Sequence, residues 1–503
     1  MIAKIKSFAL NGLIGIPLDI EIDINNGLPG FDMVGLADTA VKESKERVRS
    51  AIKNSGRTFP VKRITANLAP ADVKKEGATL DLALAIGVLK ASAQITQDTD
   101  RIIFLGELSL DGAIRRVNGI LPILISAMHE GYDTFILPYD NAKEASFATG
   151  AKVYPAKTLN EVIDHISGLK PIELLERKEY KNSKNFNKYD IDLSLVKGQS
   201  VAKRALEIAV SGGHNILFVG APGTGKTMLA KCIPTIMPDM TYSEALETTK
   251  IHSVAGVLKD ADGIVYTRPF RSPHHTASTV SLTGGNHNLR PGEISLAHNG
   301  VLFLDEMPEY SRATLEALRQ PLEDGVITVS RAVGSVTYPA NFMLCGSMNP
   351  CPCGNHGSKT KECNCTPAQI QKYASKISGP LLDRIDIRVE VDEVKYSELL
   401  EKATGETSET VRKRVNRTRA IQENRFKNEK ISTNSDMTEK HIAKYCALSL
   451  ECERILENAY KSLNMSPRAR SRVIKVARTI ADMGLYEEIR PEHILEAISY
   501  RHN

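Results

Sequence analysis

The chain has 503 residues, of which 42% are hydrophobic and 25% are charged, and its formal net charge is +5. The length exceeds what one core holds and predicts about three domains, whereas the small net charge does not by itself indicate nucleic acid. No run of about 18 apolar residues is present, and the N-terminus alternates like a strand without a signal peptide's apolar block, so we expect a cytoplasmic protein without a membrane span.

Strands and helices alternate over residues 1–170, which predicts an α/β domain. We expect strands over residues 16–24, 64–68, 102–105, 134–137 and 152–154, and helices over residues 37–53, 79–91, 119–129 and 159–166. Asp38 or Thr39 is the expected N-cap of the first helix, and Thr79 that of the second.

The rest of the chain divides into three parts. Residues 171–190 are rich in Lys, Glu and Asn and predict a linker. Residues 191–393 predict an α/β nucleotide-binding core. Residues 394–503 follow an almost wholly helical pattern, with helices expected over residues 412–426, 441–446, 450–463, 468–483 and 491–500.

A glycine-rich loop stands between an apolar run, residues 216–219, and a helix-like segment that starts at Met228. Strand, glycine loop and helix N-terminus are the context of a phosphate-binding loop, in which backbone N–H groups and the helix end face the anion. Lys226 can reach the β- and γ-phosphates, and the Thr227 hydroxyl can bind Mg²⁺. The loop consists of Gly220, Ala221, Pro222, Gly223, Thr224, Gly225, Lys226 and Thr227.

Four further segments complete a possible ATPase site. Residues 301–304 predict a buried strand that ends in two acidic residues. Asp305 can hold Mg²⁺ through water, and Glu306 can polarise the attacking water. The alternative is a strand end with solvated acids. Asn349 ends another apolar strand, residues 343–348, where it can contact the γ-phosphate or form an ordinary Asn-Pro turn. Arg384 can pair within its own subunit or reach a neighbour's γ-phosphate as an arginine finger. Arg468 lies in the first turn of a helix capped by Ser466, where it can touch the nucleotide.

In this order, these segments resemble the AAA+ ATPases of the magnesium-chelatase-like branch and, over essentially the whole chain, the competence-associated ComM (YifB) family. Other stretches typical of that family are residues 27–31, 70–72, 268–275 and 378–384. The resemblance implies a homo-hexameric ring with ATP and Mg²⁺ between subunits. By this resemblance, Lys226 is the phosphate-loop lysine, Thr227 is an Mg²⁺ ligand and Asp305 is an Mg²⁺ ligand through water. Glu306 is the catalytic base and Asn349 is sensor 1. Arg384 is the arginine finger and Arg468 is sensor 2.

The first domain resembles the Lon-protease type, which is related to ribosomal protein S5. Thr79 falls at the position of the family's nucleophilic serine, but Leu121 falls near that of its catalytic lysine. A leucine cannot accept a proton from a nucleophile, so we expect a non-proteolytic domain that binds DNA or a partner.

Two segments can contact DNA. Residues 325–338 alternate around a turn and predict a β-hairpin; by resemblance to related helicases, Arg331 at its tip would bind a phosphate, unless it is simply solvated. Residues 412–430 are rich in arginine and form either a phosphate-binding face or a solvated one. His274 and His275 are expected to point to opposite sides of an extended chain and not to share a metal.

Four of the eight cysteines lie close together, as Cys351, Cys353, Cys363 and Cys365. Four thiolates can close a structural Zn²⁺ site, although the C-x-C spacing is shorter than the usual C-x₂-C. Free thiols or a redox-active disulfide or cluster are the alternatives.

We therefore expect an ATPase that moves along branched or single-stranded DNA as a ring. A chelatase-type ATP-driven remodelling subunit and an ATP-gated scaffold are the alternatives. The Lon-like domain argues against the first alternative by family resemblance, and the intact Asp305, Glu306 and Arg384 argue against the second.

Overall fold

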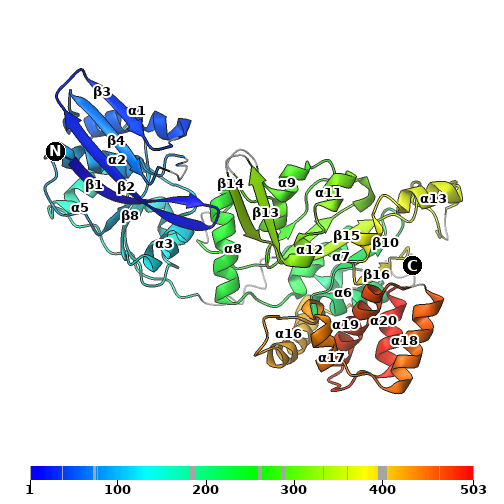
Figure 1. Ribbon diagram of the computed structural model, residues 1–503. Coiled ribbons are helices and arrows are strands. Elements are labelled where there is room, and N and C mark those ends of the chain that lie inside the picture. The colour runs from blue at the N-terminus through cyan, green and yellow to red at the C-terminus, as the bar shows by residue number, and fades with distance from the viewer. Residues whose placement is uncertain are drawn as a thin grey trace.

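The computed structural model describes residues 2–36, 38–71, 75, 77–180, 189–258, 263–285, 289–331, 334–358, 361–394, 405–463 and 465–501. Along the chain they comprise an α/β part (residues 2–180), a second α/β part (189–394) and a helical part (405–501), which we call the N-terminal domain, the P-loop domain and the lid (Figure 1). Part of the predicted linker, residues 181–188, lies outside the described residues. None of the helices described here is long and apolar enough to cross a membrane.

A seven-stranded sheet in the order β3-β4-β2-β1-β5-β8-β9 forms the N-terminal domain. Its strands are β1 (Ile2–Asn11), β2 (Ile14–Asn25), β3 (Gly30–Val34), β4 (Arg63–Ala69), β5 (Ile102–Phe104), β8 (Thr134–Pro138) and β9 (Lys152–Ala156). The helices are α1 (Thr39–Asn54), α2 (Asp81–Ala91), α3 (Ile120–His129), α4 (Ala142–Ala145) and α5 (Leu159–Ile166). Ile5 of β1 lies opposite Ile20 of β2, and both are fully buried, because alternate residues of these strands face the core.

Most of the elements expected in this domain are present. Asp38 caps α1 by accepting a hydrogen bond from the Val41 amide at 2.8 Å. The expected cap at Thr79 is wrong: α2 begins at Asp81 after Leu80, and the Thr79 carbonyl instead accepts the Gly106 amide at 2.9 Å. Strand β3 and the small hairpin of β6 (Glu107–Leu108) and β7 (Ile114–Arg115) were not predicted, because short strands carry little periodicity.

The P-loop domain contains a parallel five-stranded sheet in the order β11-β12-β15-β10-β16. These strands are β10 (Ile216–Val219), β11 (Phe270–Arg271), β12 (Val301–Leu304), β15 (Met343–Met348) and β16 (Ile387–Glu390). The helices are α6 (Ser200–Gly212), α7 (Lys226–Ile236), α8 (Tyr242–Ala255), α9 (Thr279–Thr283), α10 (Glu293–Leu296), α11 (Arg312–Glu316), α12 (Pro321–Asp324), α13 (Pro367–Ala374) and α14 (Gly379–Leu382). Because parallel strands end at one edge, the residues that follow β10, β12 and β15 meet there.

The predicted hairpin is confirmed as β13 (Val326–Arg331) and β14 (Gly334–Pro339), which pair in antiparallel register from Val326 opposite Pro339 to Arg331 opposite Gly334. The two residues of its tip, 332 and 333, lie outside the described residues.

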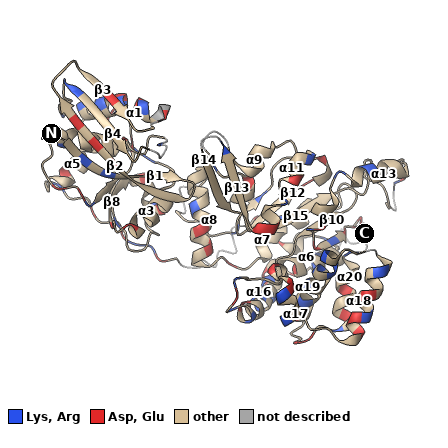
Figure 2. Cartoon of the chain, viewed as in Figure 1, with Lys and Arg blue, Asp and Glu red and all other residues tan. Residues whose placement is uncertain are grey.

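The lid consists of α16 (Ser408–Arg425), α17 (Glu439–Tyr445), α18 (Leu450–Ser462), α19 (Pro467–Met483) and α20 (Pro491–Ser499), and it carries many Lys and Arg residues (Figure 2). It shares one apolar core with the P-loop domain, in which Leu206 and Phe218 cluster with Val473 and Ile480. The lid is therefore packed on the sheet that carries the phosphate loop.

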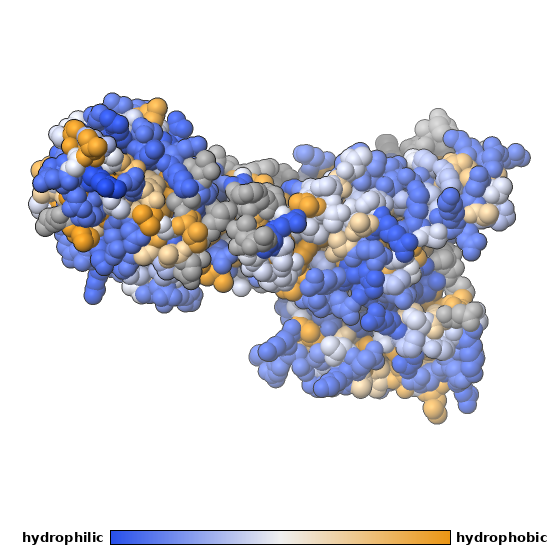
Figure 3. Space-filling model, turned by 45° about the horizontal axis from the view of Figure 1, so that its top comes forward, coloured by the Kyte–Doolittle hydropathy of each residue, from blue (hydrophilic) through white to orange (hydrophobic). Residues whose placement is uncertain are grey.

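The N-terminal domain joins the P-loop domain at a narrow waist (Figures 1 and 3). At one contact, the Gly119 amide donates to Ser253 Oγ of α8 at 3.0 Å, and Ser253 donates to the buried carboxylate of Glu144. At another, Gly12, in the β1–β2 turn, lies against Val336 of β14: a Cβ placed on Gly12 would stand 2.3 Å from Val336 Cγ1. The N-terminal domain thus touches both α8 and the hairpin.

Candidate active site

The phosphate loop has the predicted setting between β10 and α7, whose first residue is Lys226. Gly223 and Gly225 have φ angles of 82° and 94°, and no atom lies within 4 Å of a Cβ built on either. Glycine is therefore favoured here by the left-handed backbone rather than by crowding. This backbone leads directly into the N-terminus of α7, which favours an anion.

Lys226 connects the phosphate loop to the end of β15. Its Nζ donates to Gly220 O at 2.6 Å, to Ala221 O at 2.8 Å and to Asn349 Oδ1 at 3.2 Å. Only 9% of Lys226 is exposed, and this burial lowers the pKa of its ammonium. A buried cation at the start of a helix is suited to a phosphate group.

Thr227 and Asp305 bring two oxygen ligands together. Thr227 Oγ1 donates to Asp305 Oδ2 at 3.0 Å, and the other Asp305 oxygen accepts a hydrogen bond from Ser347 Oγ. A hydroxyl and a carboxylate beside each other are hard ligands of the kind that Mg²⁺ prefers. These two residues therefore fit a Mg²⁺ ion beside a phosphate chain.

Glu306 points away from the core at the end of β12. It is exposed and has a φ of 50°, and its amide donates to Asp305 Oδ1 and Ser347 Oγ, both at 3.1 Å. Its carboxylate lies 3.8 Å from His275 Nδ1. An exposed carboxylate held by a fixed backbone next to the Mg²⁺ ligands can accept a proton from water.

The two adjacent histidines differ from our expectation. The rings of His274 and His275 lie with their centroids 4.1 Å apart, so the prediction that they point to opposite sides is wrong. The loop is not extended here, because the amide of Ala277 donates to the His274 carbonyl at 2.9 Å and closes a turn.

Arg384 and Arg468 come together elsewhere, at Glu323 of α12. Arg384 pairs with Glu323 Oε2 and donates to Pro380 O at 2.8 Å, and Arg468 Nη2 lies 3.6 Å from Glu323 Oε1. Arg384 is buried, whereas 63% of the Arg468 side chain is exposed. The contacts found among the described residues do not link either arginine to Lys226 or Asp305.

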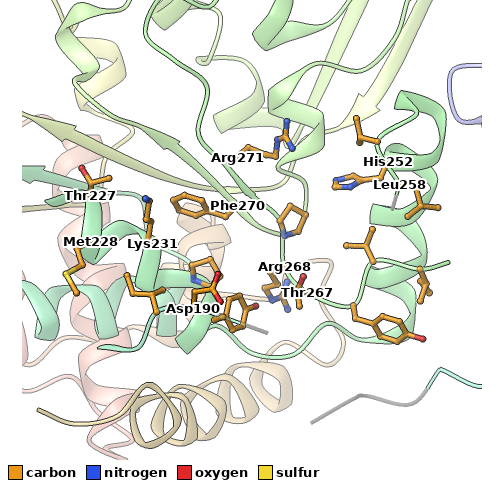
Figure 4. A pocket seen from close by; sticks show the side chains of 18 of the residues that line it. Asp190, Thr227, Met228, Lys231, His252, Leu258, Thr267, Arg268, Phe270 and Arg271 are labelled. Atoms are coloured by element: carbon orange, nitrogen blue, oxygen red, sulfur yellow. The ribbon is translucent and has the colours of Figure 1, made fainter. Parts of the chain in front are cut away.

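Two cavities flank the phosphate loop. One, of about 570 Å³, is bounded by Gly220, Ala221 and Thr224, by residues 199–201 and 390–394, and by residues 356–358. The other, of about 1180 Å³, lies along α7 beside Thr227 and Lys231, with Phe270 and Arg271 on another wall (Figure 4). In that wall, Arg271 pairs with Glu293 at 2.6 and 2.7 Å, which indicates a structural role for its guanidinium.

Arg331 lies at the end of β13, as the hairpin prediction required. Its Nε donates to Gly285 O at 2.8 Å, and Tyr338 OH of β14 donates to Leu289 O at 2.8 Å. The hairpin is thus bound to the segment that surrounds residues 286–288. Arg331 is exposed.

The arginines of α16 do not form a free cationic face. Arg412 pairs with Asp239, Arg414 with Glu207 at 2.6 Å, and Arg425 with Asp482. Arg419 donates to Val210 O at 2.9 Å. Within the described part of the lid, these contacts dock α16 onto the P-loop domain and α19, and they do not support the phosphate-binding alternative for this arginine-rich segment.

The four clustered cysteines converge in the structure, and their sulfurs lie within 4.8 Å of one another. The Sγ atoms of Cys351 and Cys353 are 3.3 Å apart, and those of Cys351 and Cys363 are 3.7 Å apart. With Zn–S bonds of about 2.3 Å, the edge of a tetrahedron is about 3.8 Å. The His356 amide donates to Cys351 Sγ at 3.3 Å, and a hydrogen bond from the Asn355 amide helps to lower the pKa of Cys353 to about 6. The spacing of the sulfurs therefore fits a tetrahedral metal site.

Two residues of this region were not predicted. Ser347 holds Asp305, and Glu323 joins Arg384 to Arg468. Neither belongs to a distinctive motif, but Ser347 is a polar residue inside an otherwise apolar strand, close to Asn349, and that pattern was a usable signal.

Comparisons with known proteins cover nearly the whole chain. Family models described as "Magnesium chelatase, subunit ChlI", "Subunit ChlI of Mg-chelatase" and "Magnesium chelatase, subunit ChlI C-terminal" match residues 192–399, 20–141 and 405–501, respectively. The uncharacterized protein YifB of Salmonella typhimurium is 43% identical, over 99% of this chain and 97% of its own length. Competence protein ComM of Haemophilus influenzae is 42% identical, over 99% of this chain and 97% of its own length. The uncharacterized protein YifB of Escherichia coli is 43% identical, over 96% of this chain and 94% of its own length.

Proposed function

The chain belongs to the ComM/YifB family of magnesium-chelatase-like AAA+ ATPases, and on this premise we propose that it is an ATP-hydrolysing ring motor that acts on DNA in the cytoplasm. The DNA activity would be of the helicase or branch-migration type, in recombination or natural transformation. The observation that carries the ATPase part is the hydrogen-bonded group in which Lys226 meets Asn349 and Thr227 meets Asp305.

In this proposal, Lys226 and the loop amides bind the β- and γ-phosphates, while Thr227 and Asp305 hold Mg²⁺. Mg²⁺, when bound, neutralises charge on the phosphate oxygens. Glu306 accepts a proton from water as the water oxygen bonds to the γ-phosphorus, and the bond from that phosphorus to the bridging oxygen breaks, leaving ADP and phosphate. Asn349 orients the water or the γ-phosphate.

A homo-hexameric ring would complete the site. Arg384 and Arg468 share Glu323 and make no described contact with their own phosphate loop, which suits a role on the γ-phosphate of a neighbouring subunit. In that arrangement, both arginines exchange Glu323 for phosphate oxygens when a neighbour binds ATP.

The hairpin is our proposed DNA contact. Arg331 is exposed at its end, and a guanidinium there can bind a backbone phosphate without reading the base sequence. For the four-cysteine cluster, we propose Zn²⁺ as the ion, because the sulfur separations match the edge of a zinc–thiolate tetrahedron.

The test is ATP hydrolysis by the full chain with and without forked or four-way DNA, together with a branch-migration assay. We expect DNA to raise the rate of hydrolysis, and we expect branch migration of the four-way junction only when ATP is present. An equal rate of hydrolysis with and without DNA, together with no branch migration, would contradict the DNA motor and favour a chelatase-type remodelling subunit or a scaffold. Lys226→Ala is the control and should lose hydrolysis in every condition.

A further inference from the structure

The described first part of the cysteine loop, residues 351–358, lies directly against the phosphate loop. Gly354 is buried and has a φ of 79°, and a Cβ built on it would stand 2.6 Å from Pro222 Cδ. Gly354 therefore packs directly against the ring of Pro222, with no room for a side chain between the two loops.

The same loop forms one wall of the 570 Å³ cavity. His356, Gly357 and Ser358 face Gly220, Ala221 and Thr224 across this cavity. Ser358 Oγ donates to Glu393 Oε1 at 2.7 Å, which ties the wall to the segment after β16. Gln199 Nε2 donates to Asp392 O at 2.6 Å and thereby joins the start of α6 to that segment.

The cavity has the size and position for the rest of a nucleotide. Small-molecule sites commonly measure about 300–1,000 Å³. It adjoins Gly220 and Ala221, at the opposite end of the phosphate loop from Thr227, which borders the other cavity. A triphosphate on the loop therefore has space on this side for its sugar and base.

We propose that this cavity holds the nucleoside of ATP and that the metal-closed cysteine loop is its wall, so that zinc occupancy sets nucleotide affinity. This inference rests on the proposed function in that ATP is the ligand of the phosphate loop. The loop needs the metal in order to fold because residues 352–358 are mostly polar or exposed, apart from the buried Gly354, and have little apolar surface to bury. The free energy of metal binding then becomes the free energy that folds the loop.

The first experiment uses the full chain and the double variant C353S/C365S. Zinc is measured by mass spectrometry, and the Kd values of ATP and inorganic tripolyphosphate are measured by competition with a fluorescent nucleotide. We expect about one zinc per wild-type chain, less than a tenth in the variant, and a rise of at least tenfold in the Kd of ATP. The Kd of tripolyphosphate should rise less, because it has no nucleoside.

A second variant, His356→Trp, keeps every thiol and adds bulk to the cavity wall. It should retain its zinc and bind tripolyphosphate normally, but bind ATP at least tenfold more weakly. Because this outcome does not need the loop to unfold, it tests the wall even if the double cysteine variant misfolds.

Two results would overturn the inference: a wild-type chain without zinc, or unchanged ATP affinity in both variants. Lys226→Ala separates it from the proposed function, because this variant should lose nucleotide but keep its zinc. If wild-type protein carries zinc but binds no nucleotide, the proposed ATPase itself is wrong.

Discussion

Arg384 forms an ion pair with Glu323, a residue 61 positions earlier in the chain, and Arg468 approaches the other oxygen of the same carboxylate at 3.6 Å. Two residues that the sequence placed in one ATP site thus meet at one carboxylate of their own subunit, where Arg384 is buried and Arg468 is exposed. In the proposed ring, Glu323 would hold both guanidinium groups in place for one phosphate group of a neighbouring subunit.

We predict that Arg384→Ala lowers ATP hydrolysis by about 10³-fold, because an arginine finger stabilises charge in the transition state. Nucleotide affinity should change much less. Hydrolysis and equilibrium binding measured on the same preparation separate these effects, and Arg384→Lys should also be slow because lysine cannot form the same two-pronged contact.

Mixing inactive variants tests whether the arginine acts between subunits. Arg384→Ala subunits keep a whole phosphate loop and Lys226→Ala subunits keep the arginine, so mixed rings should regain part of the lost hydrolysis. A mixture as inactive as either variant alone would place Arg384 in its own subunit's site.

Glu306→Gln should retain ATP binding and lose hydrolysis by about 10²- to 10⁴-fold, because the amide cannot accept a proton from water. The backbone hydrogen bonds of residue 306 to Asp305 and Ser347 do not involve the side chain and should persist. Single-turnover hydrolysis measures the loss. Rapid turnover by this variant would show that another group is the base.

Arg331→Ala should weaken DNA binding and reduce its dependence on salt by about one counterion for each phosphate contact removed. Arg331→Lys keeps the charge and is the matched control. Affinity for single-stranded DNA, measured over a range of salt concentrations, gives the slope, and hydrolysis without DNA should be normal in both variants. An unchanged slope in Arg331→Ala would remove this residue from the DNA site.

Asp386, next to β16, gives a pH prediction for docking of the lid. Burial by itself would raise the pKa of Asp386, but the neighbouring Arg472 of α19 and His214 outweigh it and hold the pKa well below its usual range. Because the folded pKa is depressed, the stabilisation is complete above the unfolded value of about 3.9 and is lost as the pH falls below it. We expect the melting temperature to fall steeply from about pH 4 downwards.

Asp386→Asn should lower the stability near neutral pH by about 3 kcal/mol, since it leaves the guanidinium of Arg472 without its carboxylate. The variant should also lose the part of the acid dependence that Asp386 causes. Thermal melting from pH 3 to pH 7 measures both changes, and parallel curves for the two proteins would contradict the assignment.

The local elements of the site could be predicted because each is written in contiguous residues. A strand, a glycine loop and Lys226 follow one another, and Asp305 ends an apolar strand. The partnerships could not be predicted in this way: Arg412 pairs with Asp239, 173 residues away, and Arg414 with Glu207, 207 residues away. A run of arginines shows no sign of which are neutralised by tertiary packing, and for the same reason Glu323 passed unnoticed.

The contact between Gly12 and Val336 has a consequence for how work would pass through the proposed motor. At this point the β1–β2 turn leaves no free space beside Val336, since even a methyl group on Gly12 would overlap that side chain. If the hairpin of the proposed motor moved towards that turn, it would therefore have to displace the seven-stranded sheet or stop there. In the proposed motor, the N-terminal domain would therefore resist movement of the hairpin, and a ligand that held this domain in place would slow the ring.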